Sequence, residues 1–115
     1  GAPVAKVESA KFVAGAVSGA GSLKVLGRAW DPEFDLPVPV RIQVTKGTTS
    51  IATDTVLANA PRPSSFIDAL SGLGPFHGVD TTIPVNAGAA GYTVCVTQLG
   101  WGGAGQSAAS CVGST

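Results

Sequence analysis

Few side chains in this chain of 115 residues have the chemistry of a catalyst. The single histidine, His77, stands in the string PFHG, where a loop is expected to enter a strand. An imidazole at such a junction commonly bonds backbone carbonyls of neighbouring loops, and it can also contact a ligand or transfer a proton. Because no nucleophile or orienting partner accompanies it, a structural role is favoured, ligand contact is the alternative, and we expect no enzyme activity.

Carboxylates occur at alternate positions in the segment formed by Asp31, Pro32, Glu33, Phe34 and Asp35. Some calcium-binding loops share this spacing, but the segment lacks the glycine and the distal bidentate glutamate of an EF-hand. A turn that begins at Pro32, with Asp31 capping backbone amides, explains the same residues. We therefore expect no metal ion and no other cofactor, with a weak cation site as the alternative.

Three further side chains, Trp101, Trp30 and Arg62, are candidates for binding a ligand together with His77. Trp101 lies among glycines in the string LGWGG, at a predicted hairpin tip, where an indole either stacks on a sugar or partner protein or folds back over the sandwich edge. Arg62 lies between two prolines that restrict the backbone, so an ion pair, for example with Asp31, competes with ligand contact as its role.

Two cysteines, Cys95 and Cys111, flank a glycine-rich stretch that is typical of a hairpin connection. A disulfide between them would stabilise the fold by about 3 kcal/mol in the chain-entropy model. Two buried free thiols are the alternative, and the secreted character of the composition favours the bond. The disulfide predicts an extracellular location.

Strand patterns recur at short intervals with Gly, Pro, Asn and Asp between them, which is typical of a sandwich. We predict seven strands, at about residues 5–13, 22–30, 38–45, 50–57, 76–83, 92–98 and 108–112, the first of them at a sheet edge. One short helical segment is expected at 64–70, between prolines and glycines. The core is best marked by two alternating series, Val38, Val40, Ile42 and Val44 in one strand and Tyr92, Val94 and Val96 in another. Because Cys95 alternates with the second series, the disulfide is predicted on the outer surface.

Length and composition exclude several classes of protein. Residues 1–115 are expected to form one domain, because the composition changes sharply nowhere. Seven basic and seven acidic residues balance, so the chain has no electrostatic signature of nucleic-acid binding. The longest nearly apolar stretch, at 87–96, is too short and too rich in glycine for a membrane-spanning helix, and we expect no membrane insertion.

Several strings resemble a repeat module of secreted actinobacterial proteins that often accompanies cell-wall hydrolases or other exported domains. They are GRAWDPE at 27–33, PVPVRI at 37–42, RP at 62–63, FHGVD at 76–80, GYTVCV at 91–96 and SC at 110–111. Arg28 and Ser64 differ from the residues that are usual at these positions of the module. The chain therefore resembles a divergent member of this group. The resemblance implies export, an immunoglobulin-like antiparallel β-sandwich, pairing of the two cysteines and a noncatalytic accessory role.

We therefore expect a noncatalytic module for binding or spacing at the bacterial cell wall or surface, within a larger multidomain protein or assembly. A cell-wall glycan or a surface protein is the expected partner. The alternative is an adhesive decoration domain of a phage virion, since immunoglobulin-like domains also serve there and fold alone does not decide function.

Overall fold

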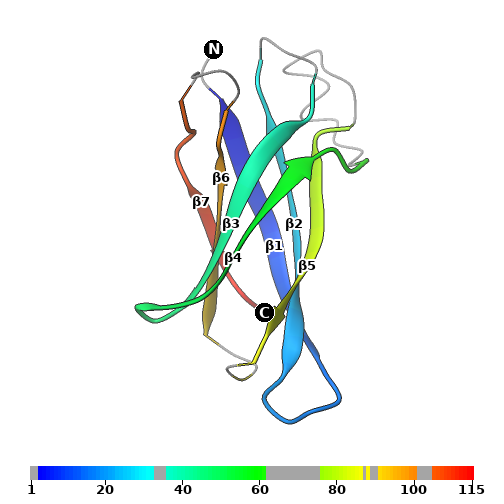
Figure 1. The fold of residues 1–115 in the computed structure, drawn as a ribbon, viewed down its shortest axis with the longest axis vertical. Coiled ribbons are helices and arrows are strands. Elements are labelled where there is room, and N and C mark those ends of the chain that lie inside the picture. The colour runs from blue at the N-terminus through cyan, green and yellow to red at the C-terminus, as the bar shows by residue number, and fades with distance from the viewer. Residues whose placement is uncertain (1–2, 33–35, 62–75, 87, 89–90, 101–104) are drawn as a thin grey trace.

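The computed structural model describes residues 3–32, 36–61, 76–86, 88, 91–100 and 105–115. Within these ranges the protein consists of strands and turns, without a helix (Figure 1). The seven strands are β1 (Val4–Ala14), β2 (Gly21–Trp30), β3 (Val38–Lys46), β4 (Thr49–Ala58), β5 (Gly78–Val85), β6 (Tyr92–Gln98) and β7 (Ser110–Gly113). The all-β prediction with seven strands is confirmed, and the helix predicted at 64–70 lies outside the described residues.

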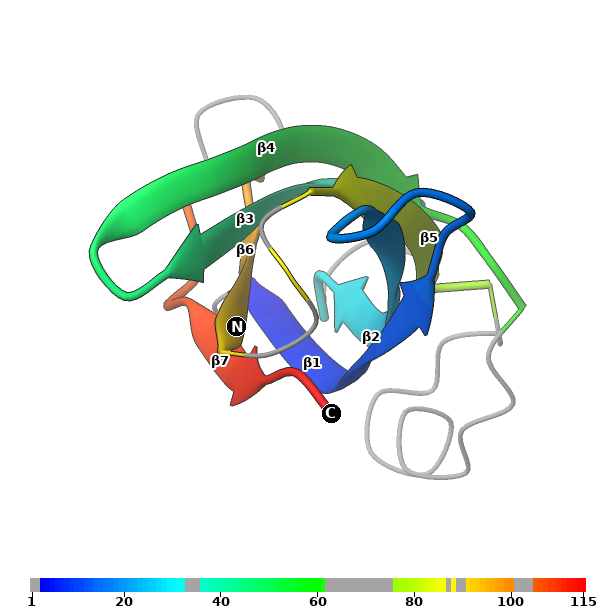
Figure 2. The same cartoon turned by 90° about the horizontal axis from the view of Figure 1, so that it is seen from below.

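The strands form two antiparallel sheets that face each other across the core. One sheet has the order β1-β2-β5 and the other has the order β4-β3-β6-β7. Figure 2 looks along the sandwich and shows β3 and β4 on one side of the interior, with β1 and β2 on the other. The predicted β-sandwich is confirmed, whereas its assignment to the immunoglobulin-like class stays a prediction.

Strict alternation in β3 and β6 builds the centre of the core. Every second residue of β3 from Val38 to Val44 has no exposed surface, and the same holds for Val94 and Val96 of β6. These strands are neighbours in register, with Ile42 opposite Val96. A side chain that alternates with a buried one must face outward, so the sequence pattern was sufficient to predict this part of the core.

The two outward-facing residues at the centre of β3 differ in exposure. Gln43 is exposed, but Arg41 is half-buried, and its neighbour across the ladder, Thr97, is only 5% exposed. A long arginine stem beside a small threonine shields both from solvent, although both point away from the core.

The cysteines of β6 and β7 form the predicted disulfide, and Cys95 and Cys111 stand directly opposite each other in the ladder. Cys111 is exposed and Cys95 is half-buried, whereas Val94 and Val96 on either side of Cys95 are buried. The bond therefore lies on the solvent side of the sheet, as the alternation predicted, and it ties β7 to the edge of the sandwich.

Strand β5 begins and ends two residues later than predicted, running from Gly78 to Val85. It continues through Pro84, which lacks a backbone donor. This is possible because β5 is an edge strand, on which the donor of one side has no ladder partner. The predicted start at Phe76 is wrong because the ladder to β2 begins only at Gly78, opposite Arg28.

Strand β1 lies at a sheet edge as predicted, but the C-terminal residues cover part of that edge. Thr115 donates to the carbonyl of Ala10 and accepts from the amide of Phe12, at 2.9 and 3.0 Å. Ser110 Oγ also accepts from the amide of Val7 at 3.0 Å. The two sheets are thus joined on this side, where Figures 1 and 2 show β1 beside β7.

Candidate functional site

Several candidate residues gather at the end of the sandwich where β2 and β6 finish and β5 begins, at the top of Figure 1. The amide of Ala29 donates to the carbonyl of His77 at 3.0 Å, which places His77 beside the end of β2. Trp30 is the last residue of β2, and Asp31 follows it. We call this end of the molecule the loop end.

The candidate side chains at the loop end that the structure describes are buried. Trp30 is 8% exposed, Asp31 5% and His77 2%. A ligand would reach only a small part of the indole or the imidazole in this arrangement. The burial favours the structural role over ligand contact for His77, and both roles stay predictions.

Gln98 is a buried polar residue that sequence reasoning did not select. Its side chain faces inward because it continues the series of Val94 and Val96, and it has no exposed surface. Its Nε2 donates to the carbonyl of Trp30 at 2.8 Å and to that of Val4 at 2.9 Å. Because Val4 and Trp30 pair across β1 and β2, one amide from the opposite sheet holds both strands at the loop end. The sequence feature that could have indicated this role is a polar residue in an otherwise apolar alternating series.

The remaining candidates are outside the part of the chain that the structure describes. Trp101 and Arg62 belong to this group, as do Glu33 and Asp35 of the acidic segment. Among the described residues, no three of the types His, Cys, Asp and Glu lie close enough to hold a metal ion. The described ranges also contain no helix that is long and apolar enough to cross a membrane.

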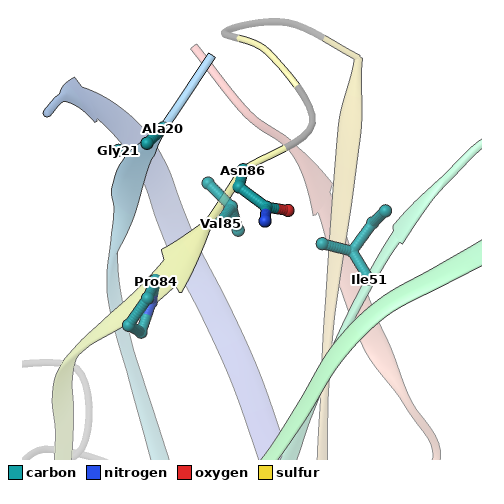
Figure 3. A pocket seen from close by; sticks show the side chains of 6 residues that line it. All are labelled: Ala20, Gly21, Ile51, Pro84, Val85 and Asn86. Carbon is teal, nitrogen blue, oxygen red and sulfur yellow. The ribbon is translucent and has the colours of Figure 1, made fainter. Parts of the chain in front are cut away.

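The end of the sandwich opposite the loop end carries an open depression of about 350 Å³ (Figure 3). Its lining comes from the start of β2, the first residues of β4 and the end of β5, and it consists of Ala20, Gly21, Ile51, Pro84, Val85 and Asn86. Asn86 is the only polar side chain of this lining, and none is charged. None of these six described residues could perform acid–base or nucleophilic chemistry.

Exposed apolar side chains lie at both ends of the sandwich, and three of those described belong to the loop end. Leu36 and Phe76 are each 58% exposed and Leu57 is 48% exposed. Leu57 pairs with Pro39 at the start of β3, and the amide of Leu99 donates to the carbonyl of the same proline at 2.9 Å. Leu57, Pro39 and Leu99 thus form an apolar row from β4 across β3 to the residue that follows β6. The connection from β6 to β7, which contains Trp101 in sequence, starts at the Leu99 end of this row.

The chain matches no known protein-family model, and neither a curated protein nor a solved structure shows significant similarity to it.

Proposed function

We propose that this chain is a noncatalytic extracellular module that binds or spaces other components at the bacterial cell wall or surface. The single observation that carries the proposal is the disulfide between Cys95 and Cys111, which ties two neighbouring strands on the solvent side. Cys111 is exposed, so reductants of the cytosol would reach the bond. Structural disulfides of this kind persist in oxidising compartments.

The shape of the sandwich supports a spacing role. The Cα atoms extend over 45 × 27 × 17 Å, and hydrogen bonds join the sheets along the β1 and β7 side. Thr115 pairs near Lys11, so it lies seven residues along β1 from Val4, a distance of about 23 Å. Val4 and Thr115 therefore lie at different points along the long axis of the module.

The loop end supports a binding role. Loops at the end of a rigid sandwich are where such folds carry recognition, and exposed apolar groups mark surfaces that contact partners. Leu36, Leu57 and Phe76 are such groups at this end. Trp101 follows Gly100 in the sequence and is the anchor that we propose for a glycan or a surface protein.

Co-sedimentation of the folded protein with isolated bacterial cell walls tests the proposal. We expect the wild-type protein to sediment with the walls, and Trp101→Ala to abolish this binding while the thermal midpoint changes little. Val17→Ala is the matched control, because Val17 is a 70% exposed apolar residue in the turn between β1 and β2, away from the loop end. It should bind like the wild type.

Two results would contradict the binding role. A wild-type protein that stays in the supernatant has no affinity for the walls. A Trp101→Ala variant that loses several kcal/mol of stability but still binds would show that Trp101 belongs to the core and is not the anchor. Release of soluble wall fragments by the wild-type protein would overturn the noncatalytic assignment.

A further inference from the structure

The outer face of the sheet β1-β2-β5 carries two rows of positive charge. In one row Lys6 stands directly opposite Arg28, and in the other Lys11 stands directly opposite Lys24. Lys24 and Arg28 are four residues apart on β2, so the rows are about 13 Å apart. We call these four residues the cationic face.

A β-bulge is the reason that both lysines of β1 point to the same side. Lys6 and Lys11 are separated by an odd number of positions, so in a regular strand they would face opposite ways. The register shifts between Val7 and Ser9, and this extra residue brings Lys11 to the side of Lys6. Val7 and Ala10 both face inward for the same reason, at 5% and 1% exposure.

Two carboxylates share this face, and they pair with the cations of β2. Asp80 contacts Lys24 at 2.8 Å, and Glu8 lies 3.8 Å from Arg28. Neither Lys6 nor Lys11 forms an ion pair with a described residue, and both are exposed. The face therefore has an excess of two positive charges, while the rest of the sequence has three cations and five carboxylates. The zero net charge of the chain conceals this separation.

Like charges opposite each other in a sheet destabilise it. The protein carries two such pairs on one face, and no negative residue stands opposite either lysine of β1. Leu26 is half-buried between the two rows, opposite Ser9 and Asp80, and it offers an apolar contact at the centre of the face. The carboxylates of Asp80 and Glu8 compensate Lys24 and Arg28, whereas Lys6 and Lys11 have no ion pair with a described residue. A bound anion would supply the charge that these two lysines lack.

We propose that the cationic face binds an anionic polysaccharide, with its carboxylates at the two rows and the apolar side of a sugar ring on Leu26. Duplex DNA carries one charge per about 1.7 Å, far denser than rows about 13 Å apart. A polysaccharide whose carboxylates are widely spaced suits this distance between the rows better. The disulfide, with its exposed Cys111, also favours an extracellular polymer over a nucleic acid. The proposal rests on the extracellular binding function proposed above and names a class of ligand for it.

The test measures binding of the whole chain to polygalacturonate, with dextran as the neutral polymer and duplex DNA as the denser polyanion. Binding to polygalacturonate is expected at about 0.01 M salt and should weaken strongly at about 1 M, where the Debye length falls to about 3 Å. Dextran should not bind. Lys6→Gln and Lys11→Gln should each weaken binding about 2–5-fold, and the double variant about 5–20-fold.

Lys46→Gln is the charge-matched control, because Lys46 lies on β3 of the other sheet, with its Nζ 5.2 Å from the centre of the Tyr92 ring. It should leave binding unchanged within about twofold. Thermal melts should show the Lys6→Gln/Lys11→Gln variant to be at least as stable as the wild type, since it removes two like-charge oppositions. That result separates loss of binding from loss of fold.

Several results would overturn the inference. If the double variant binds as tightly as the wild type, the cationic face is not the binding surface. If Lys46→Gln weakens binding as much as the lysine variants of β1 do, binding depends on the net charge of the protein and not on this face. Tighter binding to DNA than to polygalacturonate would contradict the proposed class of ligand. If the wild type binds isolated cell walls but not polygalacturonate, only this inference fails. If it binds neither, the proposed binding function fails with it.

Discussion

Replacing Gln98 by leucine removes a side chain that joins β6 to both β1 and β2 at the loop end. Leucine is similar in size and suits the apolar series of β6, so the substitution changes the hydrogen bonds more than the packing. The carbonyl oxygens of Val4 and Trp30 lose the donor that lies at 2.9 and 2.8 Å in the wild type. The variant therefore isolates the contribution of one buried amide.

The expected magnitude follows from the groups that lose and gain partners. A buried carbonyl without its donor costs about 1–3 kcal/mol, and the bond to Trp30 is buried whereas the bond to Val4 is part-buried, so the two oppose folding by at most about 2–6 kcal/mol. Gln98 Oε1 is buried and accepts no hydrogen bond from a described residue, and its removal offsets about 1–3 kcal/mol of this cost. The net loss in the free energy of unfolding should be about 1–3 kcal/mol.

Urea denaturation of the two proteins, with the same disulfide state, measures this difference. The midpoint should fall while the slope stays constant, since the surface exposed on unfolding is nearly the same. Gln43→Leu is the matched control on the exposed side of β3, and it should change stability by no more than about 0.5 kcal/mol. Equal or greater stability of Gln98→Leu would refute the idea that this amide stabilises the joined strands.

Three other expectations concern the core, the disulfide and a close backbone approach. Val94→Ala should lower the free energy of unfolding by about 1–3 kcal/mol in urea denaturation, and a change near zero would mean that the side chain is not buried. Reduction of the bond between Cys95 and Cys111 should add the mass of two hydrogens and lower stability by about 3 kcal/mol, and an unchanged mass would show that no bond exists. Gly27→Ala should lower the thermal midpoint, because its Cβ would lie 2.6 Å from the carbonyl oxygen of Lys6, whereas Gly113→Ala, with nothing within 4 Å, should not.

Local patterns were sufficient to predict much of the fold. The period-two alternation of β3 and β6 identified buried valines, because a strand with one buried face admits only one register. The same alternation predicted that Cys95 faces solvent, and the glycine-rich connection predicted that it meets Cys111. Strand ends were less certain: nothing in the residues around His77 shows where the ladder to β2 begins.

The features that bear on function depended on contacts between distant segments. In the sequence, Gln98 is only a polar residue at the end of an apolar series. Its role depends on two carbonyl oxygens of the opposite sheet that accept hydrogen bonds from its amide. Lys6 and Lys11 share a face only because of the bulge after Val7, and they meet Arg28 and Lys24 only through the register of β1 on β2. The sequence determined which residues alternate, since alternation is a property of one strand. Tertiary structure decided which charges and polar groups meet, because register and bulges are set by pairing between strands.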